Sequence, residues 1–289
     1  MTERISVIVT TYDRENALDA VLRGLGRQTD RDFEVVVADD GSGEGTRALI
    51  QRHAARRDLA LKHVWQDDRG FRAGAARNRA ILASGGTYCI FLDGDCIPRP
   101  DFVAVHRQLA EPGWFVTGNR ILMARDLTED VLAEGRRPED WGFYEWLALR
   151  RTGRINRLAP LLALALGPLR KLRPRAWRGA RSCNLAVWRS DLDRVDGFDV
   201  TYSGWGLEDS DLLIRLIHSG VRRKDGNFAT GVLHLWHAES DRSLLPENQR
   251  RLDAIARADR VRAVAGLSAL GGAAASGGAE FGPADHAAR

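Results

Sequence analysis

The chain of 289 residues is poor in cysteine and has no apolar run long enough to cross a membrane. Its three cysteines, an odd number without C-x-x-C spacing, indicate neither a disulfide framework nor a zinc knuckle. The longest apolar run, 158–169, is about half as long as a spanning helix and contains Pro160 and Pro168. The N-terminus also lacks the charged-then-apolar pattern of a signal peptide, so we expect a cytoplasmic protein.

Two common nucleotide-binding signatures are missing. The turn after the first apolar run reads Thr-Thr-Tyr-Asp-Arg-Glu-Asn, without the G-x-G-x-x-G of dinucleotide-binding folds. The glycine-rich stretch 41–47 lacks the Gly-Lys-Ser/Thr that completes a phosphate-binding loop. The sequence therefore argues against a dinucleotide oxidoreductase and against a phosphate-loop hydrolase.

Acidic residues are absent from one segment. Between Trp146 and Arg181 there are ten Lys/Arg and no Asp/Glu, whereas the formal net charge of the whole chain is only +4. The rest of the chain is therefore net acidic. Because the positive charge belongs to one segment, we expect no nucleic-acid partner.

Short β-branched runs alternate with helical patterns through the first half of the chain. This alternation predicts an α/β domain with a mainly parallel sheet flanked by helices. The expected strands are 5–10, 33–38, 61–65 and 88–92, and the expected helices are 16–27, 46–57 and 74–83.

Polar residues follow each predicted strand. Because ligands bind beyond the carboxyl ends of parallel strands, the groups at 10–13, 39–42, 66–68 and 93–95 would line one crevice. In Asp93-Gly94-Asp95, two carboxylates flank one glycine that lets a bound group approach the backbone. Such oxygen ligands suit Mg²⁺ or Mn²⁺, although an acidic turn after a strand remains the simpler alternative.

Five motifs together carry a family resemblance. Val7–Tyr12, Ala38–Ser42, Ala75–Asn78 and Asp93–Asp95 resemble, in order and spacing, the family 2 glycosyltransferases of the GT-A fold. The later stretch Gly204–Asp211 is similar to the acceptor and catalytic motif of animal β-galactosyltransferases and their bacterial relatives. The resemblance covers about residues 4 to 240 and implies a nucleotide-sugar site built by the first three-quarters of the chain.

On the donor side, the resemblance implies that Thr10, Tyr12 and Asp40 contact the nucleoside. It also implies that Asp93 meets the ribose or the water shell of the metal, and that Asp95 binds the metal directly. For Thr10 and Tyr12 the alternatives are a strand-end cap and a packed ring.

Arg72 and Arg77 stand where a loop leads into a helix, and positive charge with free helix N–H groups favours a diphosphate there. The alternative for each is a solvated surface charge.

Glu208 and Asp209 begin a helix whose leucines follow helical spacing. Acidic residues in a first turn are often only partners of the helix dipole. The resemblance instead assigns Asp209 as the general base and Glu208 as an acceptor-binding carboxylate. Trp205, between two glycines, could stack on a sugar face.

Two histidines follow this helix. The resemblance implies that His237 completes the metal shell, whereas His234 stands where the relatives carry a methionine ligand. A regular strand would point the two rings to opposite faces, so both can bind only if the chain turns between them. A packed or hydrogen-bonded histidine is the alternative for each. The expected cofactor is Mn²⁺ or Mg²⁺.

The basic segment around 150–178 surrounds the leucine-rich run with cationic residues. It could lie in the headgroup region of an anionic membrane, pack as a helix on the core, or form an oligomer contact. We expect five parts along the chain: a nucleotide-sugar-binding half (1–125), a basic apolar helical insertion (126–181), an acceptor and catalytic half (182–245), a C-terminal helix (246–265) and a disordered tail (266–289).

Together these features predict an inverting, metal-dependent glycosyltransferase. It would move a hexose or N-acetylhexosamine from a UDP-sugar to a glycan or glycolipid acceptor in cell-surface polysaccharide biosynthesis. It would work in the cytoplasm, or as a peripheral protein at the inner face of the cell membrane. The alternative is a non-catalytic sugar-nucleotide-binding module. A nucleotidyltransferase would need a glycine- and lysine-rich signature near the N-terminus, which the sequence lacks.

Overall fold

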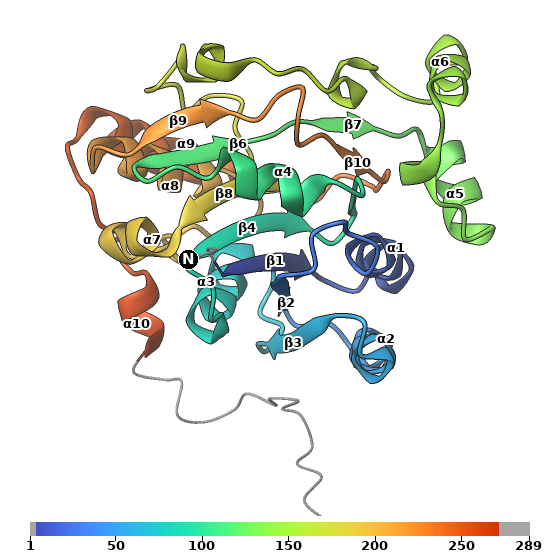
Figure 1. Cartoon of the computed structure of the whole chain (residues 1–289). Helices are drawn as coiled ribbons and strands as arrows, with labels where there is room; N and C mark the ends of the chain where they lie inside the picture. Colours follow the sequence, from blue (N-terminus) through green and yellow to red (C-terminus); the bar gives the residue numbers. More distant parts are fainter. Residues whose placement is uncertain (1–3, 272–289) are drawn as a thin grey trace, which may run out of the picture.

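The computed structural model of the chain describes residues 4–271, arranged as two sheets and surrounding helices (Figure 1). The first sheet has the strand order β3-β2-β1-β4-β8-β6-β9 and the second has the order β5-β10-β7. The strands of the first sheet are β1 (Ile5–Thr11), β2 (Phe33–Asp39), β3 (Ala60–Trp65), β4 (Tyr88–Asp93), β6 (Trp114–Thr117), β8 (Asn184–Trp188) and β9 (Arg222–Asp225). Those of the second are β5 (Cys96–Pro98), β7 (Arg120–Leu122) and β10 (Val232–His234).

The predicted strand-helix alternation is confirmed, and ten α-helices lie within the described residues. They are α1 (Glu15–Leu25), α2 (Glu44–Arg56), α3 (Ala73–Ala83), α4 (Phe102–Leu109), α5 (Arg125–Ala133), α6 (Phe143–Arg151), α7 (Arg189–Val195), α8 (Glu208–His218), α9 (Leu245–Arg257) and α10 (Leu267–Gly271).

Strands β3, β2, β1 and β4 run parallel. Their continuous apolar sequences fit this arrangement, because a parallel sheet is buried on both faces. Only β8 opposes its neighbours β4 and β6. The register pairs Thr10 with Asp93 and Thr11 with Asp39, so the polar ends of three strands lie side by side. The polar strand ends that were predicted to line one crevice are therefore neighbours in the sheet.

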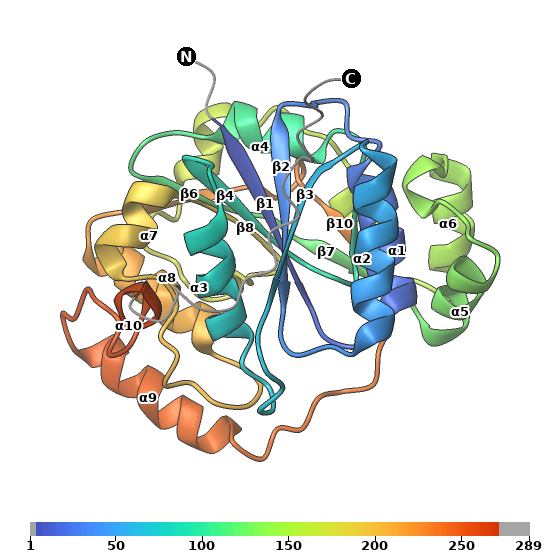
Figure 2. The same cartoon turned by 90° about the horizontal axis from the view of Figure 1, so that it is seen from below.

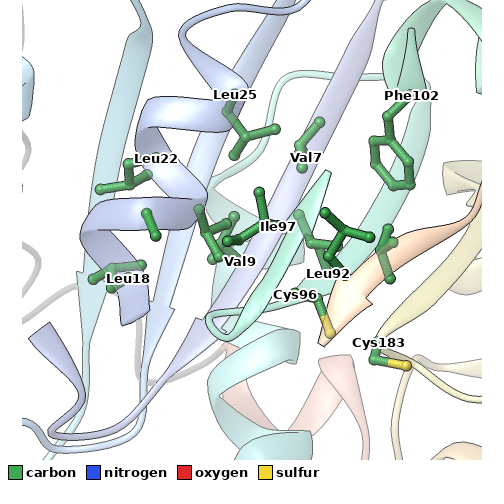
Figure 3. Close-up of a cluster of buried hydrophobic side chains, with 14 of the residues drawn as sticks. Val7, Val9, Leu18, Leu22, Leu25, Leu92, Cys96, Ile97, Phe102 and Cys183 are labelled. Carbon is green, nitrogen blue, oxygen red and sulfur yellow. The ribbon is translucent and has the colours of Figure 1, made fainter. Parts of the chain in front are cut away.

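Helices cover both faces of this sheet (Figure 2). On one face, α1 and α2 pack their apolar residues against β1 and β2. In that cluster Leu18, Leu22 and Leu25 meet Val7 and Val9 (Figure 3). The other face is covered by α3, α7 and α8. All three cysteines are buried and free, as expected for a chain without a disulfide framework.

The second sheet starts directly after the Asp-Gly-Asp turn. The Gly94 N–H donates to the Thr10 carbonyl over 2.7 Å, and a Cβ at Gly94 would lie 2.9 Å from that oxygen. Only glycine fits this close approach. The chain then enters β5, whose Cys96 pairs with His234 of β10. This pairing brings the end of β10 beside Asp95.

Two predictions for the C-terminal region were wrong. The last long helix ends at Arg257 rather than near Val264, because residues 259–264 are irregular and bond to the α7 region, with Ala263 N–H donating to the Val195 carbonyl. Residues 267–271 are helical rather than disordered, since Leu267 is buried and its N–H donates to the Asp196 carbonyl. The remaining part of the expected tail, 272–289, lies outside the described residues.

The predicted helical insertion (126–181) is α-helical only in its first part. Helices α5 and α6 are present, but the leucine-rich run 158–169 forms no α-helix. It consists of short 3₁₀ turns at Ala159–Leu161 and Gly167–Lys171, because Pro160 and Pro168 each remove a backbone donor and break helical bonding. Within residues 4–271, no helix combines the length and the apolar character that crossing a bilayer requires.

Candidate functional site

A cavity of about 410 Å³ opens at the carboxyl ends of β1 and β4. Its lining comes from both halves of the chain: the strand ends, the loop before α3, the loop before α8 and the segment after β10. Of the predicted site residues, this cavity is lined by Thr10, Tyr12, Asp40, Arg77, Asp93, Asp95, Trp205 and His237. This is the position where an open α/β sheet holds its ligand.

Asp95, His234 and His237 come together as a potential metal site, with ligand atoms that all lie within 4.8 Å of one another. Nε2 of His234 lies 3.7 Å and Nε2 of His237 lies 3.5 Å from the Asp95 carboxylate. The two rings are neighbours, with centroids 5.3 Å apart and planes tilted by 43°. Because β10 ends at His234, the chain turns before His237 and the opposite-face problem of a regular strand does not arise.

The surroundings of both histidines suit metal binding. Burial, together with the nearby Arg120, lowers the pKa of His234 to about 4, so its imidazole is neutral at pH 7. Nδ1 of His237 donates to the Ala238 carbonyl over 2.6 Å, so Nε2 is the nitrogen that faces Asp95. One carboxylate and two imidazoles form a donor set that fits a divalent transition metal.

Arg14 is a residue of this site that the sequence interpretation missed. Its Nη1 donates to Asp95 over 2.8 Å and its Nη2 donates to the Trp236 carbonyl over 3.1 Å. Its guanidinium therefore neutralises the same carboxylate that a metal would use. The available signal was its position in the loop after β1, four residues beyond Thr10.

Asp40 is held rigidly at the donor side of the cavity. It is buried and accepts hydrogen bonds of 2.6 Å from Gln66 Nε2 and from the Arg72 backbone N–H. Burial raises its pKa, and the two hydrogen bonds oppose that rise. The guanidinium of Arg72 turns away to the Asp67 carbonyl and does not line the cavity.

The Tyr12 ring is not packed in the core. It is 48% exposed, lines the cavity, and its hydroxyl donates to Asp68 over 3.0 Å. Phe71, 40% exposed, also lines the cavity, although the sequence interpretation gave it no role. These two exposed rings offer flat apolar surface to a base or a sugar.

Arg77 links the donor side of the cavity to the predicted catalytic helix. The buried guanidinium donates to Thr10 Oγ1 (3.0 Å), Asp93 (3.1 Å) and Glu208 (2.9 Å). Burial lowers its pKa, but the surrounding carboxylates outweigh burial and the pKa is raised. Its three partners come from β1, β4 and α8, so one cation fixes three elements around the cavity.

The carboxylates at the start of α8 lie behind this arginine. Burial and the neighbouring Asp209 raise the pKa of Glu208, against the opposing effect of Arg77. The Asp209 carboxylate accepts from the Ser182 N–H and from the Ser210 hydroxyl, each over 3.3 Å. Neither Glu208 nor Asp209 lines the cavity.

Trp205 does line the cavity, on the loop that leads into α8. Its ring carries the Arg242 guanidinium at 4.7 Å from the centroid. The backbone around it is unusual, with positive φ at Gly204, Gly206 and the non-glycine Leu207. A bulky residue rarely adopts this conformation, so the loop is strained next to the predicted catalytic carboxylates.

Two family matches together span almost the whole site. Residues 6–171 match the family described as glycosyl transferase family 2. Residues 170–238 match the family described as the N-terminal domain of galactosyltransferase. The boundary between the two matches falls in the basic segment, between the donor-side strands and the residues around α8.

Curated relatives are similar over most of this chain. The chain is 33% identical over 236 residues to validoxylamine A glucosyltransferase of Streptomyces hygroscopicus subsp. limoneus, covering 75% of this chain and 48% of that protein. It is 29% identical over 248 residues to chondroitin synthase of Pasteurella multocida (strain Pm70), covering 78% and 24%. The chain therefore spans about half the length, or less, of these relatives.

Solved structures confirm the predicted GT-A fold. S. aureus TarS 1–349 in complex with UDP superposes with a TM-score of 0.59 at 16% identity, covering 87% of this chain and 65% of that one. GalNAc-T7 with UDP, GalNAc and Mn²⁺ superposes with a TM-score of 0.61 at 17% identity, covering 88% of this chain and 48% of that one. The mannosyltransferase PcManGT from Pyrobaculum calidifontis with GDP-Man and Mn²⁺ superposes with a TM-score of 0.54 at 21% identity, covering 96% of this chain and 76% of that one.

Proposed function

We propose, from the premise that this chain belongs to glycosyl transferase family 2, that it is an inverting, metal-dependent enzyme. It would move a hexose or N-acetylhexosamine from a UDP-sugar to a glycan or glycolipid acceptor in cell-surface polysaccharide biosynthesis. The observation that carries the proposal is the junction of the Asp95, His234 and His237 group with a cavity of about 410 Å³. A nucleotide-sugar could place its diphosphate at this junction.

The need for a cation follows from charge. A diphosphate entering this cavity would meet Asp40, Asp93 and Asp95, and a divalent metal offsets the repulsion and stabilises the leaving group. We propose Mn²⁺ over Mg²⁺, because Mg²⁺ prefers oxygen ligands and this set contains two imidazoles. The structural neighbours GalNAc-T7 and PcManGT, which share the fold and are solved with Mn²⁺, support that choice.

Roles for the remaining residues are proposed as follows. Thr10, Tyr12 and Asp40 would contact the nucleoside, with Asp93 at the ribose, Trp205 against the acceptor sugar and Arg72 and Arg77 near the diphosphate. The guanidinium of Arg72 points away and that of Arg77 is buried among three partners. Arg14 also has partners, but its side chain is about one-third exposed (34%), so it is the cation best able to turn toward a phosphate.

Asp209 would act as the general base on the acceptor hydroxyl, and Glu208 would bind the acceptor. Since neither lines the cavity, the proposal requires the strained loop 204–207 to move when substrates bind. Asp209 would take the proton of the acceptor hydroxyl, whose oxygen would bond to the anomeric carbon as the nucleoside diphosphate leaves, and this single displacement inverts that carbon. Product with the donor's anomeric configuration, read from the proton coupling by NMR, would exclude this mechanism.

We also propose the predicted division of labour along the chain, with donor binding in 1–125 and acceptor binding and catalysis in 182–245. The two family matches and the mixed lining of the cavity support it. The cytoplasm is the proposed compartment, because all three cysteines remain free thiols.

The proposed function is tested by a screen of nucleotide-sugars with Mn²⁺, covering UDP-glucose, UDP-galactose, UDP-N-acetylhexosamines and GDP-mannose. Thermal stabilisation and slow donor hydrolysis should single out UDP-sugars, and UDP alone should also stabilise. A preference for GDP-mannose would overturn the UDP assignment. Tight binding without hydrolysis, or without transfer to any acceptor, would favour the non-catalytic sugar-nucleotide-binding module.

A further inference from the structure

The segment from α6 to Arg175 forms one edge of the molecule, beyond β9 and β7 at the top of Figure 1. This edge exposes large apolar side chains and cations together. We call it the basic edge and define it by the exposed residues Phe143, Tyr144, Arg150, Arg151, Leu162, Leu164, Leu169, Leu172, Arg173 and Arg175.

The apolar side chains of the basic edge have little cover from the rest of the chain. Tyr144 is 84% exposed and Leu172 is 73% exposed. On α6, helical spacing places Tyr144 and Arg151 on a common face, away from the buried Trp146 that anchors the helix. Several large apolar residues gathered on one exposed edge are uncommon on a monomer unless they meet a partner.

The cations of the basic edge also lack partners. Within residues 4–271, no carboxylate pairs with Arg150, Arg151, Arg173 or Arg175. Nearby carboxylates are already taken, since Glu111 pairs with Lys171 and Lys224, and Asp126 and Asp130 pair with Arg154. The edge therefore presents unneutralised positive charge beside its apolar groups.

A hollow of about 170 Å³, lined by apolar side chains together with Arg99 and Glu139, lies under the same edge. Phe143 and Leu162 form its rim, and Trp141, Trp146 and Leu233 line it more deeply. Leu233 directly precedes His234 of the metal group. Strand β10 therefore contributes one residue to the hollow under the basic edge and the next residue to the proposed metal site.

We propose that the basic edge docks the protein on an anionic lipid bilayer. The exposed leucines and aromatic rings would enter the interface, and the arginines would meet lipid phosphates. An anionic glycan would explain the arginines but leave the apolar side chains exposed. A second copy of the chain would cover the leucines but bring the unpaired arginines of two edges together.

The test is co-sedimentation of the full chain with vesicles of neutral lipid alone and of neutral lipid with 30 mol% anionic lipid. Wild type should bind the anionic vesicles at 0.1 M salt and largely release at 1 M, where the screening length falls from about 10 Å to about 3 Å. The triple variant Arg150→Gln, Arg151→Gln, Arg173→Gln should bind about 10²-fold more weakly, because each basic residue near an anionic leaflet contributes about fivefold.

The matched control is Arg52→Gln, Arg56→Gln, Arg57→Gln, which removes the same charge from exposed arginines on and just after α2, at the opposite end of the molecule (Figure 1). It should bind like wild type. Arg170 and Lys171 are unsuitable targets, because Arg170 is buried on three backbone carbonyls and Lys171 pairs with Glu111. Tyr144→Ser with Leu172→Ser should weaken binding about 10²-fold while leaving the salt dependence in place.

Several outcomes would overturn the proposal. One is equal binding to neutral and anionic vesicles, and another is equal loss in the triple variant and its control. Retention on an anionic polysaccharide without vesicle binding would identify a glycan surface instead. A monomer produced from a wild-type dimer by the Tyr144 and Leu172 changes would identify a subunit contact. None of these measurements uses a donor, so their failure leaves the proposed glycosyltransferase function untouched.

Discussion

Arg14 and Asp95 form an ion pair of 2.8 Å at the centre of the candidate metal site. The arginine comes from the loop after β1 and the aspartate from the turn after β4, so the two meet only because those strands are neighbours. A divalent cation that binds Asp95 would compete with this guanidinium for the negative charge of the carboxylate. The pair would therefore weaken metal binding, and Arg14 would be held less firmly with a metal bound.

Arg14→Ala should strengthen Mn²⁺ binding in the absence of nucleotide by about 3- to 10-fold. The competing guanidinium is gone, and its partial exposure keeps the effect modest. Isothermal titration calorimetry measures the change. Arg136→Ala, which removes an exposed arginine paired with Glu134, should leave Mn²⁺ affinity unchanged. Weaker Mn²⁺ binding in the Arg14 variant would contradict the competition.

Removing either imidazole should damage the metal site. His234→Ala and His237→Ala should each weaken Mn²⁺ binding by at least about 10²-fold, because altering even an outer partner of a metal ligand typically costs 10- to 100-fold. Excess chelator should abolish turnover of wild type. His218→Ala, far along α8, serves as the control and should bind Mn²⁺ normally. Unchanged metal affinity in one of the two histidine variants would leave the other as the ligand.

Asp209→Asn should lower turnover by about 10² to 10⁴, the usual contribution of a general base. The fold and UDP binding should be retained, because the amide oxygen can still accept from the Ser182 N–H. Steady-state rates and a UDP titration separate the two effects. A rate close to that of wild type would move the role of base to Glu208.

Arg77→Met should destabilise the folded protein by about 3–5 kcal/mol, because it leaves Asp93 and Glu208 without their shared buried cation. Urea unfolding measures this loss. Arg194→Ala, which breaks an ion pair with Asp191 from the exposed side, should cost less than about 1 kcal/mol. If Arg77→Met were as stable as wild type but failed to bind UDP, a direct role in diphosphate binding would be favoured.

We expect the folded protein to lose stability as the pH falls, because the fold keeps His106 neutral. Burial lowers the pKa of His106 to about 4, so the folded chain keeps it neutral while the unfolded chain protonates it near pH 6.5. The contribution is complete above pH 6.5 and is lost as the pH falls toward 4, by about 2 kcal/mol between pH 6.5 and 5. Urea midpoints should drop less over that range in His106→Gln. Parallel pH profiles for the two proteins would contradict this assignment.

Much of the fold follows from local sequence pattern. Continuous β-branched runs such as Ile5–Thr11 form buried parallel strands wherever they alternate with amphipathic helices, so the sheet and the crevice at its edge were predictable. The Asp93-Gly94-Asp95 turn was readable because only glycine tolerates the approach to the Thr10 carbonyl. The predicted helical character of the basic insertion was wrong for the leucine-rich run 158–169. Its two prolines keep this run from forming an α-helix despite its apolar composition.

The site itself was decided by long-range contacts. The residue types at Asp95, His234 and His237 were evident in the sequence, but pairing of β5 with β10 is what makes them converge. The position of Arg14 in the loop after β1 placed it near the crevice, but its partner could not be read locally, because that partner is an aspartate 81 positions away. The sequence suggested that Arg77 is free to bind a phosphate, whereas in the fold it already donates hydrogen bonds to residues of three elements. A sequence determines which groups are present and their local conformation, whereas burial and partner choice depend on packing between distant segments.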